Sequence, residues 1–276
     1  MKRIEIDELK KISSDMLREV DKICRKNNIT YYLSFGSLIG AVRHKGFIPW
    51  DDDIDICVFR KDYNRLMEAI QKDERYRFIS FETDPNYYFG FGRICDKRTI
   101  IKHRPHRKVK NFGVWIDVFI LDNAPEESKR EEWAQQFKRL NKILRATVPT
   151  PFEFYSIRYW LSKRFFFHYL KSYKTRLRFG TKNFSKYRDK FIQLQTKYDE
   201  SSNYVMVPIT PYGARVCFPK TWFEDTIDLD FEGIKVMAPK DYDKILTKTY
   251  GNYMQIPPIE KRIKRHYFQA YWLNKK

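Results

Sequence analysis

Carboxylates alternate with large apolar residues in the segment Trp50-Asp51-Asp52-Asp53-Ile54-Asp55-Ile56. In a β-strand, residues two apart project to the same face, so Asp53 and Asp55 are expected to lie side by side while Ile54 and Ile56 face the other way. Two like charges that close together repel each other unless a cation lies between them. The segment therefore predicts a strand with one buried face and a hard divalent metal, Mg²⁺ or Mn²⁺, on the other.

Two further acids and a Pro-Trp pair flank this predicted strand. Asp51 is in phase with Asp53 and is expected to join it as an auxiliary metal ligand. Asp52 is out of phase and is expected to point away, as a solvated acid or a turn cap. A solvated acidic loop is the alternative for the whole segment, but the preceding Pro49-Trp50 pair is untypical of such a loop.

Asp117 stands alone among apolar residues in Val114-Trp115-Ile116-Asp117-Val118-Phe119-Ile120-Leu121. This segment is predicted to be an inner strand. A carboxylate buried in such a strand is costly unless it has a partner or a metal. Placing Asp117 beside Asp53 and Asp55 would satisfy both needs. We therefore predict one shared metal site, in which Asp117 is either a ligand or a general base.

A Gly-Ser pair precedes the acids in Phe35-Gly36-Ser37. Residues 31–35 are predicted to form a strand that runs into a Gly36-Ser37 turn, followed by a short helix at 38–42 whose N-terminal amides face whatever the turn holds. Gly36 allows close approach to the backbone, and Ser37 offers a hydroxyl to phosphate. A plain strand-to-helix turn is the alternative for Gly36. A metal beside such a turn favours phosphoryl chemistry.

Helix and strand patterns alternate through the first half of the chain, which indicates an α/β or α+β fold. Helical spacing predicts helices at 9–23 and 63–70, and apolar runs predict strands at 54–59, 78–81, 89–94 and 113–121. A charged helix is predicted at 126–144, and short strands and turns in the last quarter of the chain, including 216–219 and 231–234. We divide the chain into a catalytic core at 1–125, a basic, aromatic and mainly helical region at 126–205, and a C-terminal segment at 206–276 that packs on the core.

The composition indicates a folded protein with an anionic partner. Hydrophobic residues make up 42% of the 276 residues, and the formal net charge is +19. Such a charge favours binding to a nucleotide, a nucleic acid or an anionic membrane face. The four cysteines are scattered, which excludes a zinc ribbon and favours a reducing compartment. No apolar run approaches the ~20 residues that cross a bilayer, so we expect a cytoplasmic protein, free or peripheral on the inner membrane face.

The most basic stretch of the chain is residues 158–190, with eleven Lys or Arg against the single acid Asp189 and with interleaved aromatic residues. One interpretation is that helices lie on an anionic leaflet with the aromatic rings at the headgroup level. The other is a helical subdomain with buried aromatic residues and a solvated basic face. An interruption of regular secondary structure is predicted before this stretch, at Pro149-Thr150-Pro151.

With these residues in view, the chain resembles the LicD family, which is related to the fukutin group within the nucleotidyltransferase-fold superfamily. The superfamily pattern is matched by Phe35-Gly36-Ser37, by Asp53-Ile54-Asp55-Ile56 and by Asp117. The narrower resemblance covers residues 36–55 without a gap and continues in residues 93–99, 115–119, 238–242 and 250–254. It is weakest from 149 to 202. The resemblance implies a nucleotidyltransferase-like mixed sheet core with flanking helices.

The resemblance also implies an activity. Family members transfer a phosphorylated alcohol from a CDP-activated donor to a glycan hydroxyl and release CMP; phosphocholine from CDP-choline is the typical bacterial case, and ribitol phosphate is the fukutin-type variant. The acceptor would be a lipid-carried precursor of lipopolysaccharide or teichoic acid. Asp53, Asp55 and Asp117, with Asp51 as an auxiliary ligand, would then hold the metal on the donor diphosphate.

Basic residues between the Gly-Ser pair and the acids become candidate phosphate contacts through the same resemblance. These are Arg43, His44 and Lys45, with a solvated basic turn as the alternative. Arg93 and Arg98 are further candidates. His103 and His106 lie in a basic loop and are expected at the surface.

A choline headgroup requires ring faces, because a quaternary ammonium has no hydrogen to donate. Four aromatic residues lie near the motifs in sequence and are cage candidates, although each could equally belong to the core: Trp50, Tyr87, Tyr88 and Trp115.

Two other functions stay open. A nucleotidyltransferase that passes a nucleotide to a small molecule would use the same metal site, and only its products would distinguish it. A nucleic-acid-binding protein is suggested by the net charge alone; no recognition motif for nucleic acid is present, and the acids would repel phosphates. We therefore expect no nucleic-acid partner.

Overall fold

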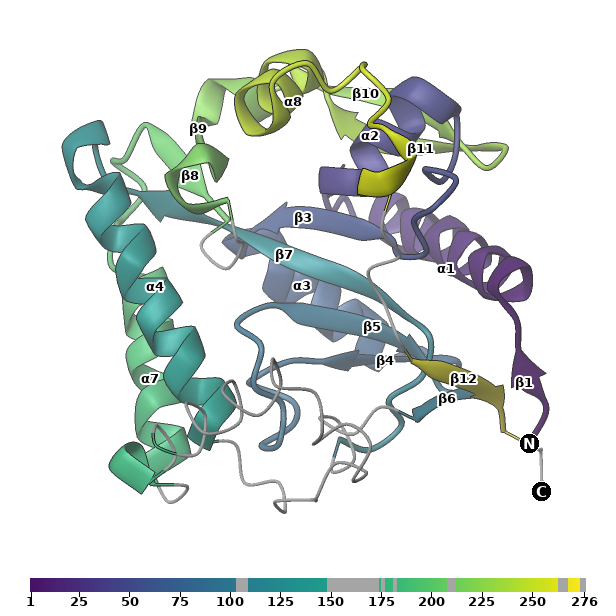
Figure 1. Cartoon of the computed structure of the whole chain (residues 1–276), viewed down its shortest axis with the longest axis horizontal. Coiled ribbons are helices and arrows are strands. Elements are labelled where there is room, and N and C mark those ends of the chain that lie inside the picture. Colours follow the sequence, from purple (N-terminus) through teal and green to yellow (C-terminus); the bar gives the residue numbers. More distant parts are fainter. Residues whose placement is uncertain are drawn as a thin grey trace.

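A mixed β-sheet forms the centre of the computed structural model, which describes residues 1–102, 109–147, 174, 177–180, 183–207, 212–262 and 268–273 (Figure 1). The main strand order is β2-β3-β7-β5-β4, and β8 and β9 extend the sheet from the far end of β7. β3 and β7 are parallel, and the other neighbours in the sheet are antiparallel. The strands are β2 (Tyr32–Leu33), β3 (Asp55–Phe59), β4 (Tyr76–Ile79), β5 (Gly92–Asp96), β7 (Trp115–Ala124), β8 (Tyr204–Met206) and β9 (Cys217–Pro219).

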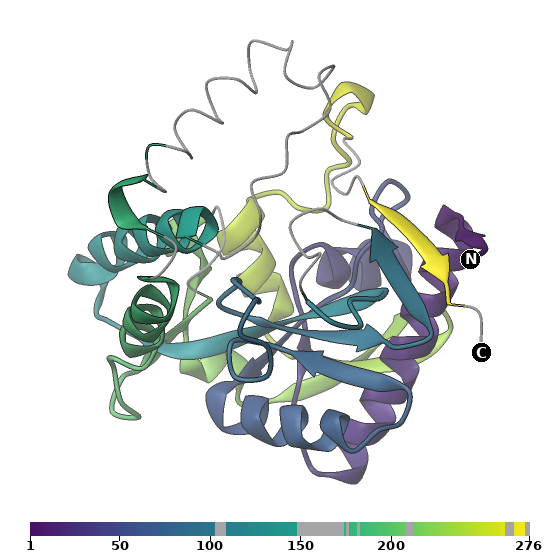
Figure 2. The same cartoon turned by 90° about the horizontal axis from the view of Figure 1, so that it is seen from below.

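Two amphipathic helices, α1 (Ile6–Lys26) and α3 (Arg60–Gln71), cover one face of this sheet (Figure 2). Their buried Met16, Leu17 and Leu66 belong to the same core cluster as Ile56 and Val118 on the strands. Alternation along a strand sends one set of side chains to these helices and the intervening set to the opposite face. The isoleucines between the acids therefore fix the side of the sheet on which the acids lie.

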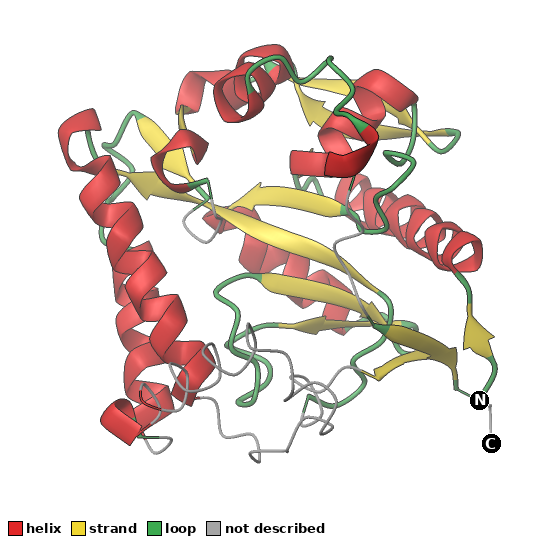
Figure 3. Ribbon diagram, viewed as in Figure 1, coloured by secondary structure: helices red, strands yellow, loops and turns green. Residues whose placement is uncertain are grey.

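A second core lies on the opposite face, where α4 (Glu127–Thr147) and α7 (Phe184–Gln195) pack against each other at one end of the sheet (Figure 3). Phe137 joins the two helices, because its ring lies 4.9 Å from that of Trp133 and 5.1 Å from that of Phe191. These rings belong to a core cluster that also contains Phe119 of β7. The helices therefore bury the far part of the face that carries the acids.

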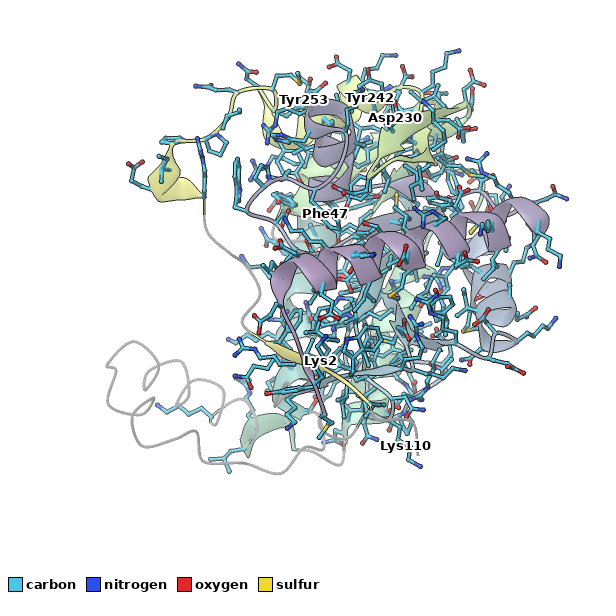
Figure 4. The ribbon with its side chains drawn as sticks, turned by 90° about the vertical axis from the view of Figure 1, so that its right-hand side faces the viewer. Lys2, Phe47, Lys110, Asp230, Tyr242 and Tyr253 are labelled. Atoms are coloured by element: carbon cyan, nitrogen blue, oxygen red, sulfur yellow. The ribbon has the colours of Figure 1, made fainter. Side chains whose placement is uncertain are left out.

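The helix that follows β2 is α2 (Phe35–His44), and it packs against the hairpin of β10 (Thr226–Phe231) and β11 (Ile234–Pro239) and against α8 (Tyr242–Tyr250). Glu232 in the hairpin turn holds the chain after α2: its backbone N–H donates to the Lys45 carbonyl, and its side chain accepts from the Phe47 N–H. In Figure 4, Phe47 lies between α1 and this hairpin, and its ring is 5.1 Å from that of Phe231.

A small sheet of β1 (Arg3–Ile4), β12 (Gln269–Trp272) and β6 (Thr99–Lys102) joins the two ends of the described chain. Short 3-10 turns complete the elements: η3 (Gly213–Val216), η4 (Lys220–Phe223) and η5 (Ile259–Lys261). Within the described residues, no helix combines the length and the apolar character needed to span a bilayer.

The predicted α+β class is confirmed, and so are the helices at 9–23, 63–70 and 126–144 and the inner strand that carries Asp117. One local prediction is wrong: Gly36 and Ser37 lie in the first turn of α2 and not in a turn before it. The cause is Phe35, whose positive φ of 48° turns the chain directly from β2 into the helix. The predicted break at 149–151 and nearly all of 158–183 lie outside the described residues, and the domain boundaries at 125 and 205 stay predictions.

Candidate active site

Three strands place charged side chains in one row across the sheet. Asp55 of β3 is the register partner of Asp117 of β7, which in turn pairs with Arg93 of β5. The Asp117 N–H also donates to the Ile54 carbonyl at 2.9 Å, which holds the residues just before β3 against β7. As a result, Asp53, Asp55 and Asp117 each offer an oxygen, and these oxygens lie within 4.8 Å of one another. The structure thus brings together the three acids that the sequence predicted to converge.

This acid cluster (Asp53, Asp55 and Asp117) has the donor set of a hard-metal site. All three ligands are carboxylate oxygens, which suit Mg²⁺ or Mn²⁺ rather than a softer ion. Asp117 is buried, whereas Asp53 and Asp55 are half-buried, so the cluster is open on one side. An open side leaves coordination positions for the oxygens of a substrate.

A second group of acids overlaps the first, because Asp51, Asp52 and Asp53 also offer oxygens within 4.8 Å of one another. Asp52 is not part of the group with Asp55 and Asp117, and the prediction that it points away from the metal stays a prediction. Alternation between faces holds only inside a strand, and residues 51–54 precede β3, which begins at Asp55. Asp53 is the residue common to both groups.

Gly36 lies beside the acids because it has no side chain. A Cβ atom at this position would lie 2.6 Å from Oδ2 of Asp51, which is too close for a real contact. The Asp51 carboxylate therefore lies against the first turn of α2, where the positive end of the helix dipole favours an anion.

Replacing Gly36 by Ala should displace the Asp51 carboxylate and lower turnover by roughly tenfold to a hundredfold, since a misplaced supporting group near a metal typically costs that much. The helix should tolerate Ala, so the thermal unfolding midpoint should hardly change. The Gly36→Ala, Asp51→Gly double variant relieves the clash and is the matched control. If Gly36→Ala keeps full turnover, Asp51 has no fixed place in the site.

Ser37 joins α2 to β3 through its hydroxyl, which accepts the Asp55 N–H at 2.8 Å. Among the described residues, this hydroxyl has no acceptor for its own hydrogen. No side chain caps the N-terminus of α2 at Ser34. Ser37 and the first amides of α2 are therefore donors beside the acid cluster, as anion binding requires.

Arg93 forms a buried ion pair with Asp117, with Nε 2.5 Å from Oδ1 and both side chains less than one-tenth exposed. Its guanidinium carbon lies 4.6 to 5.5 Å from the centroids of four rings, those of Phe89, Phe91, Phe112 and Trp115. Burial opposes the charge of Arg93, but the neighbouring Asp117 carboxylate outweighs it and raises the pKa of Arg93 above its ordinary value. Arg93 thus fixes one oxygen of Asp117, and its predicted contact with phosphate stays a prediction.

The basic residues at the C-terminal end of α2 contact other parts of the protein itself in this structure. Arg43 Nη1 donates to the Tyr253 carbonyl at 2.6 Å, and Arg43 Nε donates to His44 Nε2 at 2.9 Å. Burial lowers the pKa of both side chains, and the charge of Arg43 lowers the pKa of His44 further. Lys45 ends the helix with a left-handed φ of 59°. Their proposed contacts with phosphate stay predictions.

Among the described residues, those that the sequence suggested for a choline cage or a secondary contact are buried or engaged with other side chains, and their proposed roles stay predictions. Tyr87, Tyr88 and Trp115 are buried in the core, and the guanidinium of Arg262 lies over the Trp50 ring at 4.9 Å. Arg98 pairs with Asp96 and lies over the Trp272 ring. His103 and His106 lie outside the described residues.

An aromatic wall of Phe35, Phe119 and Tyr212 was missed by the sequence reasoning. The Phe35 ring lies 5.1 Å from Phe119 and 6.1 Å from Tyr212, on which it stacks. Phe119 follows Asp117 by two residues and shares its face of the sheet. A positive φ is rare for a bulky residue and marks strain of about 1–3 kcal/mol, which is concentrated at functional sites. The only sequence signal was the position of Phe35 directly before Gly36-Ser37.

Sequence comparisons with known proteins match the part of the chain that carries the acid cluster. The model of the LicD/FKTN/FKRP nucleotidyltransferase domain matches residues 28–159, which contain the whole acid cluster. The lipopolysaccharide cholinephosphotransferase LicD of Haemophilus influenzae is 30% identical over 285 aligned residues, which cover 99% of this chain and 100% of that protein. The chain belongs to the LicD family. Because the alignment with this LicD protein runs the full length, the family assignment includes the C-terminal elements that pack on α2.

More distant members of the family share shorter stretches. The ribitol 5-phosphate transferase FKRP of human and mouse is 40% identical over 45 residues, which is 16% of this chain and 9% of FKRP. An uncharacterized protein of Rickettsia prowazekii is 31% identical over 112 residues, or 40% of this chain. The link between the LicD family and the fukutin group that the motifs suggested is therefore confirmed.

Proposed function

We propose that this protein transfers a phosphorylated alcohol, specifically phosphocholine from CDP-choline, to a hydroxyl of a cell-surface glycan such as a lipopolysaccharide or teichoic acid precursor, with release of CMP. The observation that carries the proposal is the acid cluster in a chain that aligns over its whole length with a cholinephosphotransferase. The FKRP similarity supports the same reaction class with another alcohol.

The acid cluster would hold the metal, with Asp51 as an auxiliary ligand. When bound, Mg²⁺ would neutralise negative charge on the donor diphosphate. We assign Asp117 as a ligand rather than a base, because Arg93 already engages one of its oxygens. Ser37 and the first amides of α2 would donate hydrogen bonds to phosphate oxygens.

In the proposed step, the oxygen of the acceptor hydroxyl attacks the phosphorus that bears the alcohol. A new P–O bond forms, the bond from that phosphorus to the CMP oxygen breaks, and CMP leaves with the electron pair. The hydroxyl proton passes to a carboxylate at the open side of the cluster or to water. Catalysis then comes mainly from positioning and charge neutralisation, as is usual in phosphoryl transfer.

The aromatic wall supports choline as the transferred alcohol. A quaternary ammonium binds aromatic rings, and the half-buried Phe35 packs against Phe119, which lies two residues after Asp117 on the same face of the sheet. Phe35→Ala would weaken binding of CDP-choline more than binding of CMP if the wall receives the choline group.

The proposal is tested with purified protein, Mg²⁺, a panel of CDP-alcohols and candidate glycan acceptors. We expect CMP release that requires CDP-choline, an acceptor and a divalent metal, and that stops when the metal is chelated. Release of pyrophosphate from CTP would instead identify a nucleotidyltransferase. Tight, salt-sensitive binding of RNA or DNA without any turnover would favour the nucleic-acid-binding alternative.

A further inference from the structure

Three large apolar side chains are exposed close together in residues 251–262, which we call the projecting segment. Met254 is 53% exposed, Ile256 51% and Ile259 74%. Single exposed apolar residues are ordinary, but several gathered on one short segment mark an interaction surface. Figure 4 shows this part of the chain, including η5, standing out from the body of the molecule.

The projecting segment is held in place by its own hydrogen bonds, so the exposure is built into the fold. Arg43 Nη1 donates to the carbonyls of Tyr253 and Gln255 at 2.6 and 3.4 Å. The Tyr253 hydroxyl donates to Asp243 at 2.6 Å, and Arg262 Nε donates to the Pro257 carbonyl at 2.9 Å. A segment ordered before it binds loses little conformational entropy on binding.

The same contacts connect the projecting segment to α2 and to Trp50, both of which precede the acid cluster along the chain. Arg43 lies near the end of α2, whose first turn carries Gly36 and Ser37. Arg262 lies over the ring of Trp50, the residue directly before Asp51. The segment is therefore joined by direct contacts to two parts of the chain that lead into the site.

The local charge indicates the chemistry of the partner. The projecting segment contains Lys261, Arg262 and one acid, Glu260, within a chain of net charge +19. Apolar side chains flanked by cations are typical of segments that bind the interface of an anionic bilayer, where the side chains enter the headgroup region and the cations contact lipid phosphates.

We propose that the projecting segment docks this protein on an anionic membrane surface, with Met254, Ile256 and Ile259 inserted among the lipid headgroups. Docking would hold the acid cluster at the surface that carries a lipid-linked acceptor; only this consequence, and not the docking itself, rests on the proposed function. The basic stretch at 158–190 is a different candidate for the same contact, so the experiment has to separate the two.

A fluorescent label at position 256 reports insertion directly. All four native cysteines are buried, and burial raises the pKa of Cys57 and Cys95 to about 12 and that of Cys217 to about 11. A polarity-sensitive maleimide should therefore label the Ile256→Cys protein at the introduced thiol. With vesicles of phosphatidylcholine and phosphatidylglycerol, we expect a blue shift and brighter emission. The Ile6→Cys protein, labelled on α1, should show neither change.

Flotation with the same vesicles tests the energetic contribution of the segment. The combined Met254→Ser, Ile256→Ser and Ile259→Ser variant should bind at least about tenfold more weakly than the native chain, since membrane affinity scales with buried apolar area. Ile6→Ser removes a comparable exposed side chain, 39% exposed, and should bind normally. Unchanged thermal unfolding would show that all variants fold.

Three results would overturn the proposal: no flotation of the native chain at low salt, equal flotation of the triple variant, or an unshifted label on bound protein. The second result would place the contact in another basic region. If the native chain instead forms a dimer that the triple variant loses, the segment is a self-association surface. None of these measurements uses turnover, so failure of docking and failure of the proposed transfer reaction are distinguishable.

Discussion

Turnover is expected to fall by at least about a thousandfold when Asp53 is replaced by Asn, because the substitution removes a charged oxygen ligand from the proposed metal site while keeping the shape of the side chain. Asp53 is the residue that both groups of acids share. The fold should persist, since Asp53 is half-buried and lies outside β3. The measurement is CMP release at saturating donor and metal, with circular dichroism to confirm folding.

Asp52→Asn is the matched control for this prediction. Asp52 belongs only to the group that lacks Asp55 and Asp117, so its replacement should reduce turnover far less. Equal losses in the two variants would place the essential metal between Asp51, Asp52 and Asp53. Near-normal turnover in Asp53→Asn would remove the acid cluster from the mechanism altogether.

Stability is expected to fall by about 3–5 kcal/mol when Arg93 is replaced by Met, because Asp117 is then left as a buried charge without its partner. The side chains of both residues are less than one-tenth exposed. Urea unfolding measures the loss. The Arg93→Met, Asp117→Asn double variant carries no unpaired charge and should recover much of the stability, but it should stay inactive because a metal ligand is missing.

A second buried ion pair on the same strand supplies the control. Arg60 binds Asp122, whose side chain is only 1% exposed, so Arg60→Met should also be strongly destabilising. Asp122 lies beyond the acid cluster on β7, and transfer by the Arg60→Met variant should stay near normal at a temperature where it is folded. If Arg93→Met behaves in the same way, Arg93 has only a structural role and does not position Asp117.

Local sequence patterns predicted most of the elements that build the site. The alternation of acids with Ile54 and Ile56 correctly predicted a strand, but β3 is buried on both faces beyond Asp55, because Cys57 lies in the second core. The same rule does not extend to Asp51, Asp52 and Asp53, because these residues precede β3. It also gave no account of Phe35, whose left-handed conformation depends on contacts with Phe119 and Tyr212.

The sequence by itself determined the α+β class, the family, the side of the sheet that carries the acids and the identity of the proposed metal ligands. The class and the side of the sheet follow from residue type and periodicity, which are local properties of the chain, whereas the family followed from the resemblance of motifs such as residues 36–55. Only the tertiary structure decided the register that pairs Asp55 with Asp117, the neutralisation of Asp117 by Arg93 and the exposure of the projecting segment. Each of these depends on hydrogen bonding and packing between segments that are distant along the chain, which a local pattern does not encode.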